Sequence, residues 1–216
     1  MIYESHYWKT ELYKCFLTIA NYRHLQKITE RSNVKIEKAL MIGAYIIRKL
    51  DEAQKIPPDL LNNKEILKFY NNKGTIVDHL NWHKIDKHYD LYKISKTEKE
   101  WRFILNQIIH SFSFIFSFDS FDKLDGFHIN SDKTKGKALF FLPLNILFKI
   151  FLTVSEGDIT STYSHRTLIG KENDIKPMFG EMKLISATYS YQDNFDINKS
   201  VLDSMNGNIY KRIKEE

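Results

Sequence analysis

The chain is poor in cysteine, proline and glycine, with one, four and eight of these residues respectively in a length of 216. A single cysteine cannot form an intramolecular disulfide bond, so a disulfide-stapled fold is excluded and a reducing compartment is favoured. Cys15 falls on the apolar face of the first predicted helix. We therefore interpret it as a small buried hydrophobic residue and not as a nucleophile.

The sequence also lacks a recognisable targeting or membrane segment. Its start, MIYESHYWKTELYK, does not show the basic region followed by an apolar region that marks a secretory signal. The most apolar run, 138–154, contains Pro143, Asn145 and Lys149 and is shorter than the ~20 apolar residues of a spanning helix. We therefore expect a cytoplasmic protein that does not enter a membrane.

Three common functional motifs are missing as well. The chain has no GxxxxGK[ST], GxGxxG or GxSxG, so it lacks the local signatures of phosphate loops, dinucleotide-binding folds and hydrolases. His79, His83 and His88 are clustered, but a metal site needs three or four converging ligands, and the flanking composition favours strand and loop. We predict neither a metal nor a cofactor, and a zinc site on these histidines is the least favoured alternative.

Charge of one sign is only slightly in excess. The chain has 32 Lys and Arg against 27 Asp and Glu, a net charge of +5. This balance permits an acidic partner such as RNA, but no Arg-rich run marks a nucleic-acid-binding segment. With 43% hydrophobic and 14% aromatic residues, the chain is predicted to be globular and not disordered.

Helices are predicted at the start of the chain. Apolar residues recur at spacings of three and four over 5–27, which indicates one buried helix face. A second helix is expected from about 29 or 32 to 54, and its middle, 39–47, is apolar on almost all sides, which is typical of a central helix. Residues 59–70 suggest a short helix, and 74–94 suggest extended pieces and loops.

The centre of the chain is predicted to change from helix to strand. Ser95 and Thr97, each followed three residues later by a glutamate, form two overlapping capping boxes that predict a helix start. Apolar residues at helical spacing continue this helix to about residue 109. From His110 the period becomes two, which places four phenylalanines on one face of a strand: Phe112, Phe114, Phe116 and Phe118.

The fold class predicted from these patterns is α+β, with N-terminal helices packed on a small antiparallel β-meander and a polar C-terminal appendage. Strands are expected over 127–130 and 137–142, with an Asp-Gly turn before the first and a helix after the second, from Leu144. We expect one core domain over 1–156 and a polar extension packed on it over 157–216.

The extension is predicted to contain little regular structure. One strand is plausible over 181–191, and an amphipathic piece is expected over 201–213. We interpret Lys211 and Arg212 near its end as a solvated helix terminus, with contact to a partner as the alternative.

One polar edge of the predicted central helix is our candidate site. Arg102, Asn106 and His110 are four residues apart, so they drift by only ~40° per step and share one side of the helix. They combine an always-charged donor, an amide and a titratable imidazole. Arg48 on the second helix is expected to face this edge, either as a site residue or in an ion pair at the rim.

The string LNQIIHSF, with its Asn-x-x-x-His core, resembles the catalytic helix of HEPN (higher eukaryote and prokaryote nucleotide-binding) domains. The resemblance implies a helical, commonly dimeric protein, in many members a metal-independent ribonuclease of toxin–antitoxin or phage-defence systems. It makes His110 the catalytic histidine and Asn106 the polar residue. The family's arginine position holds Leu105 here, so Arg102 or Arg48 would take its role. Together with LNWHKIDKHYDLY, the string is also similar to an uncharacterised group of small bacterial proteins.

Two classes of function follow as hypotheses. The first is a cytosolic binding or regulatory module, by analogy from a bacterial phage-defence or toxin–antitoxin setting, in which His110 ties the backbone at a helix–strand junction. The alternative is a HEPN-like ribonuclease in which His110 moves the proton as a ribose 2′-hydroxyl attacks its phosphate and an arginine neutralises the phosphate. The expected partner is a protein or RNA, and a homodimer is a further alternative.

Overall fold

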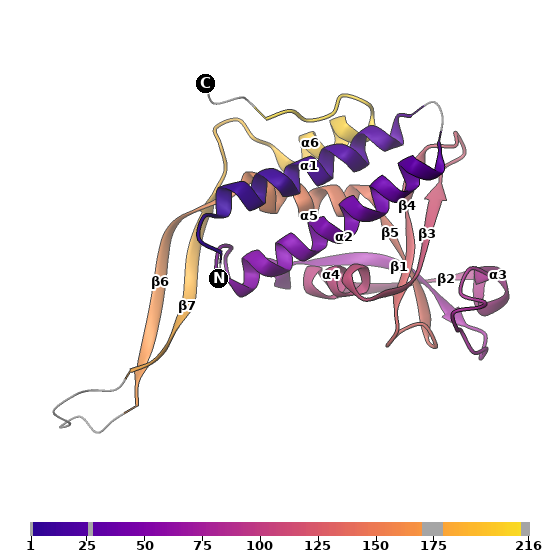
Figure 1. Cartoon of the computed structure of the whole chain (residues 1–216), viewed down its shortest axis with the longest axis horizontal. Coiled ribbons are helices and arrows are strands. Elements are labelled where there is room, and N and C mark those ends of the chain that lie inside the picture. Colours follow the sequence, from indigo (N-terminus) through magenta and orange to yellow (C-terminus); the bar gives the residue numbers. More distant parts are fainter. Residues whose placement is uncertain (1, 26–27, 170–178, 213–216) are drawn as a thin grey trace.

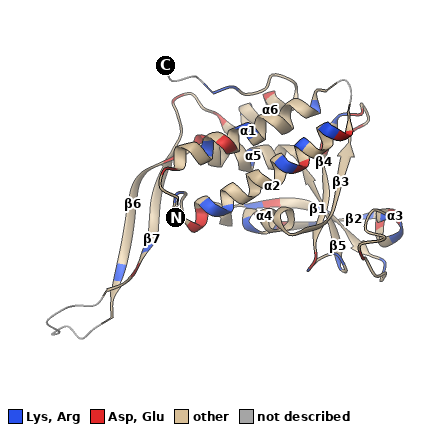
Figure 2. Cartoon of the chain, in the orientation of Figure 1, with Lys and Arg blue, Asp and Glu red and all other residues tan. Residues whose placement is uncertain are grey.

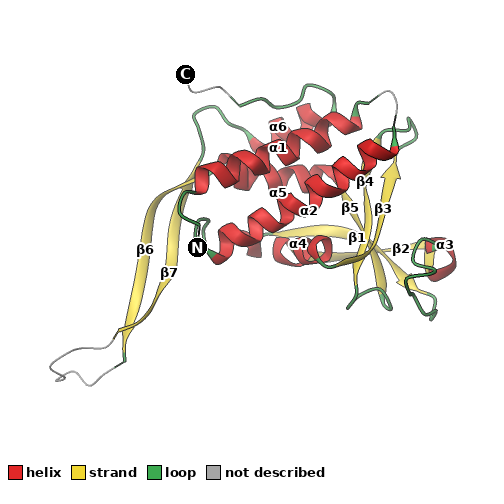
Figure 3. Cartoon of the chain, viewed as in Figure 1, coloured by secondary structure: helices red, strands yellow, loops and turns green. Residues whose placement is uncertain are grey.

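Two layers form the body of the molecule, and a long hairpin projects from one end of it (Figures 1 and 3). The computed structural model describes residues 2–25, 28–169 and 179–212. Helices cover one face of a five-stranded sheet, and the main core lies between these layers. The fold class is therefore α+β, as the sequence predicts. In the described part of the chain, no helix combines the length and apolar character that crossing a bilayer requires.

The two N-terminal helices are confirmed. Helix α1 spans Ser5–Arg23 and helix α2 spans Glu30–Glu52, which begins after Thr29 because the Thr29 hydroxyl accepts from the Ser32 amide. The remaining helices are short, apart from the apolar α5, and follow in chain order: α3 (Ile85–His88), α4 (Trp101–Ile109), α5 (Leu144–Glu156) and α6 (Ile197–Met205).

The sheet is antiparallel at every strand pair and has the order β2-β1-β5-β4-β3. The predicted meander is present as β3, β4 and β5, and two strands from earlier in the chain, β1 and β2, extend the sheet beyond β5. The strands are β1 (Lys64–Asn72), β2 (Tyr89–Glu100), β3 (Ser111–Phe118), β4 (Leu124–Ser131) and β5 (Ala138–Pro143).

Two local predictions are wrong. Residues 95–100 lie in strand β2 and not in the first turns of a helix, and α4 begins only at Trp101. Of residues 59–70, a single turn over Leu60–Asn62 is helical and the rest enters β1. In both cases the ladder between β1 and β2, in which Leu67 lies opposite Thr97, supplies backbone partners along the whole segment, whereas capping boxes satisfy only the first turn of a helix.

The predicted strand after His110 is present as β3, but its phenylalanines do not all share one face. An irregularity in the pairing with β4 lies between Ser111 and Ser113, and a bulge of this kind re-aims a side chain. Phe114 and Phe116 therefore pack against the main core, whereas Phe112 packs against a second small cluster formed by Val77, Tyr89 and Leu139.

The region after α5 forms a projecting arm and a returning segment. Strands β6 (Asp158–Leu168) and β7 (Phe179–Ser190) pair into the hairpin that leaves the body in Figure 1; we call this hairpin the arm. The predicted strand over 181–191 thus corresponds to β7, and β6 is an addition. After α6 the chain runs back over α1, where Arg212 bonds both oxygens of the buried Glu156 carboxylate at 2.9 and 3.1 Å. Arg212 is therefore not the solvated helix end that the sequence suggested.

Close approach of α2 to α5 depends on the absence of a side chain at Gly43. A Cβ atom at this position would overlap the ring of Phe151, which is fully buried on α5, and would also touch Leu12. Because packed interiors leave no room for such a group, the residue at position 43 sets how closely the central helix can pack.

We predict that Gly43→Val lowers the free energy of unfolding by about 2 kcal/mol, because the new side chain must displace Phe151. Gly136→Val is the matched control, since a Cβ there meets no atom within 4 Å, and it should change stability by less than about 0.5 kcal/mol. Urea denaturation measures both. Equal stability of the two variants would show that α2 and α5 do not pack as described.

Candidate functional site

The polar edge predicted from the sequence lies between α2 and α4, and Arg48 does face it. One guanidinium nitrogen of Arg48 donates to the Asn106 side-chain oxygen at 2.7 Å. The other reaches Glu52 at 3.2 Å, one helical turn further along α2. Arg102 does not bond to either residue of this pair: it donates to the Asp51 carboxylate at 2.6 Å. The edge is thus a set of polar contacts that joins the two helices.

His110 is close in sequence to this set but is not tied into it through its ring. It is the residue that ends α4, and its backbone N–H donates to the Asn106 carbonyl at 3.1 Å. Its side chain is exposed, and within the described ranges no hydrogen bond to its ring is present. The structure therefore joins Arg48 to Asn106 and holds Arg102 on Asp51, while His110 stands apart at the surface.

Acidic partners neutralise both arginines of the edge. Charges of both signs lie along α2 (Figure 2), and each arginine of the site meets one of its carboxylates. Hydrogen bonding from Lys49 holds the pKa of Glu52 below its usual range, so this carboxylate is ionised at neutral pH. An arginine that already has an ionised partner would have to exchange it before it could bind a phosphate.

The three clustered histidines do not converge. His88 is buried, with one ring nitrogen 2.7 Å from the Thr75 hydroxyl and the other 3.2 Å from the Asn81 carbonyl. His79 lies against the ring of Phe112, and His83 lies beside Trp82. Among residues 2–25, 28–169 and 179–212, no group of three or more His, Cys, Asp or Glu side chains is placed to hold a metal ion.

Cys15 is buried, as expected for a structural residue, and burial raises the pKa of its thiol to about 11. At neutral pH the sulfur is therefore protonated almost entirely, whereas a nucleophilic cysteine needs its thiolate form.

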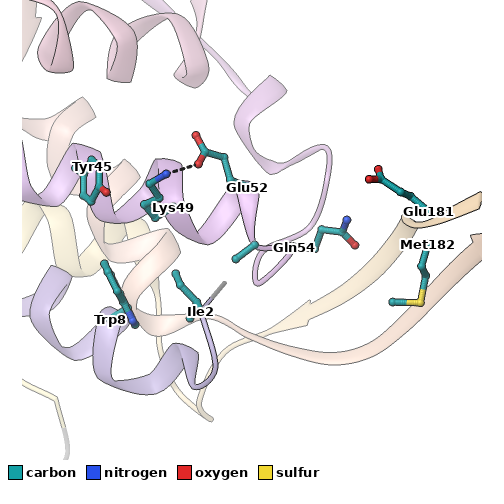
Figure 4. A pocket seen from close by; sticks show the side chains of 9 residues that line it. Ile2, Trp8, Tyr45, Lys49, Glu52, Gln54, Glu181 and Met182 are labelled. Carbon is teal, nitrogen blue, oxygen red and sulfur yellow. Dashed lines mark hydrogen bonds and ion pairs between the residues drawn. The ribbon is translucent and has the colours of Figure 1, made fainter.

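A large open cleft lies between the body and the arm (Figure 4), and we call it the arm cleft. Its volume is about 780 Å³. The body contributes the aromatic rings of Trp8 from α1 and Tyr45 from α2, and the arm contributes Glu181 and Met182 from β7. The complete lining also includes residues at the start of the chain and around the end of α2: Ile2, Lys49, Glu52, Ala53 and Gln54.

Strand β7 is the strand of the arm nearer the body (Figure 1), and its neighbours Glu181 and Met182 both line the cleft. The pairing with β6 shifts register between Arg166 and Leu168, opposite this part of β7, and a bulge of this kind re-aims side chains. Strand β7 pairs with β6 on one side, and the described residues provide no strand for its other side. Its unpaired backbone N–H and C=O groups can therefore accept another extended chain.

The cleft has an apolar surface with a polar rim that carries charges of both signs. Met182 is 52% exposed, Tyr45 48% and Trp8 36%, which are high values for large apolar side chains. Lys49 bonds Glu52 at 2.7 Å and lies over the Tyr45 ring, and Glu52 is also bonded by Arg48. Glu181 has no basic side chain within ion-pairing distance among the described residues, so its carboxylate is available to a basic ligand.

Sequence reasoning missed this cleft because its lining comes from three distant segments. Apolar residues on the otherwise polar β7 were the local signal that could have indicated it. Comparisons of the chain with protein-family models, with curated proteins and with solved structures found no match. Its function must therefore be argued from the geometry and chemistry of its own surfaces.

We predict that Asn106→Ala lowers the free energy of unfolding by about 1.5 kcal/mol, because it removes the acceptor that holds the Arg48 guanidinium between α2 and α4. His110→Ala on the same helix should change stability by less than about 0.5 kcal/mol, since its side chain is exposed. Both values come from urea denaturation. A loss for His110→Ala as large as that for Asn106→Ala would assign the histidine a structural contact.

Proposed function

We propose that the protein is a non-enzymatic binding module that captures an extended polypeptide segment in the arm cleft. The observation that carries this proposal is the free edge of β7 opposite exposed aromatic side chains of the body. A single reduced cysteine is consistent with a cytoplasmic setting for such a module.

Strand addition is the mode of recognition that suits this geometry. An incoming segment would continue the β6–β7 ladder, so that main-chain hydrogen bonds supply affinity without regard to sequence. Because alternate residues of an added strand project the same way, every second side chain would contact Trp8, Tyr45 or Met182. A basic residue of the ligand would pair with the Glu181 carboxylate. The preferred ligand therefore alternates apolar and basic residues.

The polar edge between α2 and α4 supports binding more than catalysis. Arg48 and Arg102 are engaged by Glu52 and Asp51, and the described residues that surround His110 provide no hydrogen bond that would orient its ring. A general base is normally held by a neighbouring group so that one nitrogen faces the reacting proton. These contacts fit a helix-joining role.

We expect short labelled peptides in which isoleucine alternates with lysine to bind the wild-type protein, measured by fluorescence polarisation. Met182→Ala and Trp8→Ala should each weaken binding at least about tenfold, because each removes part of a desolvated apolar contact. Tyr163→Ala is the matched control: Tyr163 is 62% exposed on β6 of the same arm but does not line the cleft. Equal affinity in all four proteins would refute the cleft as the binding site.

The ribonuclease hypothesis requires His110 to act in catalysis. Because the His110 side chain is exposed at the end of α4, one turn after Asn106, it can be substituted to test this role. From our proposal we expect wild-type protein and His110→Ala to leave bacterial growth and total RNA equally intact after expression. RNA cleavage by the wild type that is lost in a folded His110→Ala variant would overturn the non-enzymatic assignment and identify His110 as catalytic.

A further inference from the structure

The sheet has a second face, opposite the helices that cover the main core; we call it the outer face. Residues of the 77–89 segment cover one end of it, where Val77 and Tyr89 pack with the fully buried Leu139 and with Tyr70. Residues alternate between the two sides along each strand. In β1, Leu67 and Phe69 pack into the main core, so Lys68 between them points outward. Strand pairing places one residue from each strand in a row across this face: Lys96, Lys68, Phe141, His128 and Ile115.

Three rings form a continuous aromatic surface on the outer face. The ring of His128 lies 5.6 Å from that of Tyr70 and 5.2 Å from that of Phe141, between centroids. All three side chains are half-buried, so part of each ring faces solvent. Burial lowers the pKa of His128, which keeps its imidazole neutral at physiological pH and therefore suitable as a stacking surface.

Two lysines border these rings with positive charge, and the Asp125 carboxylate of β4 lies near Tyr70 and His128. Lys68 and Lys96 are directly opposite each other on β1 and β2, and both are exposed. Like charges at directly opposed positions destabilise a strand pair. Neither lysine has an acidic side chain within ion-pairing distance in the described ranges, and the nearby Glu98 is already bonded to Lys64 at 3.1 Å.

We propose that the outer face binds single-stranded nucleic acid. Bases would stack on Tyr70, Phe141 and His128, and backbone phosphates would contact Lys68 and Lys96. The row from Lys96 to His128 crosses three strand spacings, roughly 14 Å, which suits the two or three bases that a four-stranded sheet stacks in known RNA-binding domains. The phosphates would relieve the repulsion between the lysines, and stacking requires no particular base.

This proposal is independent of the arm cleft, which shares no residue with the outer face. It also requires no cleavage chemistry, since it concerns the opposite side of the sheet from α4. An acidic polypeptide could satisfy the lysines but would leave the flat rings without a stacking partner. The combination of rings with two lysines that form no ion pair among the described residues therefore favours nucleic acid.

The test is fluorescence anisotropy of the full chain with labelled oligouridylate and oligothymidylate at several salt concentrations. The double variant Lys68→Ala/Lys96→Ala should bind at least about tenfold more weakly, and the slope of log affinity against log salt should become shallower by about 1.4, or 0.7 for each lost phosphate contact. Phe141→Leu should weaken binding with the slope unchanged, because it removes stacking and not charge.

The control is Lys35→Ala/Lys38→Ala, which removes the same charge from the exposed face of α2. It should bind as the wild type does. Thermal melting of each variant establishes that it is folded; if Phe141→Leu melts early, Tyr70→Leu replaces it. Absence of wild-type binding, an equal loss in the control, or equally tight binding of polyglutamate would overturn the proposal.

Discussion

The position of the arm depends on one buried carboxylate, that of Glu156 at the end of α5. It is 7% exposed, and it accepts hydrogen bonds from Arg212 and, at 3.1 Å, from the Tyr210 hydroxyl. A buried charge is tolerated only with such partners, because its desolvation costs several kcal/mol. The next two residues are held by Lys9, whose ammonium bonds the Gly157 carbonyl and Asp158 at 2.5 and 2.6 Å. The chain therefore leaves the body in a fixed direction, and this direction sets the width of the arm cleft.

An isolated hairpin is only marginally stable in water, so the arm must take stability from its base. Tyr189 supplies it: its hydroxyl donates to the Val154 carbonyl at 3.0 Å, and its ring occupies the space beside Gly157 where a side chain would otherwise lie. Further out, Phe179 and Ile185 are 57% and 50% exposed. A long strand edge with apolar side chains is a hazard that proteins usually cover. The proposed polypeptide ligand would cover it.

The sequence predicts the fold wherever local pattern and tertiary pairing agree. The helical spacing in 5–23 and the alternation in β3 are strong enough to identify those elements. The prediction fails at Ser95–Glu100, where good capping residues are used in a strand because β1 supplies a full ladder. The sequence also predicts that Arg48 faces the edge that holds Asn106, and the two half-buried side chains are bonded between α2 and α4. It could not reveal that Arg212 returns to Glu156, because no local pattern encodes a contact between residues so far apart.

The outer face has an unusual feature for a sheet, a pair of lysines at directly opposed positions. On the same pair of strands, Lys64 bonds Glu98, so the ladder does place opposite charges together where it serves stability alone. Four residues further along β1, the chain instead sets Lys68 opposite Lys96, and the ring of Phe141 lies on the next strand. Repulsion between opposed lysines is a cost that folding does not require. A partner that brings negative charge and flat rings to this position would relieve the repulsion, and this relief would contribute to the free energy of binding. The stability of the fold alone does not explain why the two lysines are opposed.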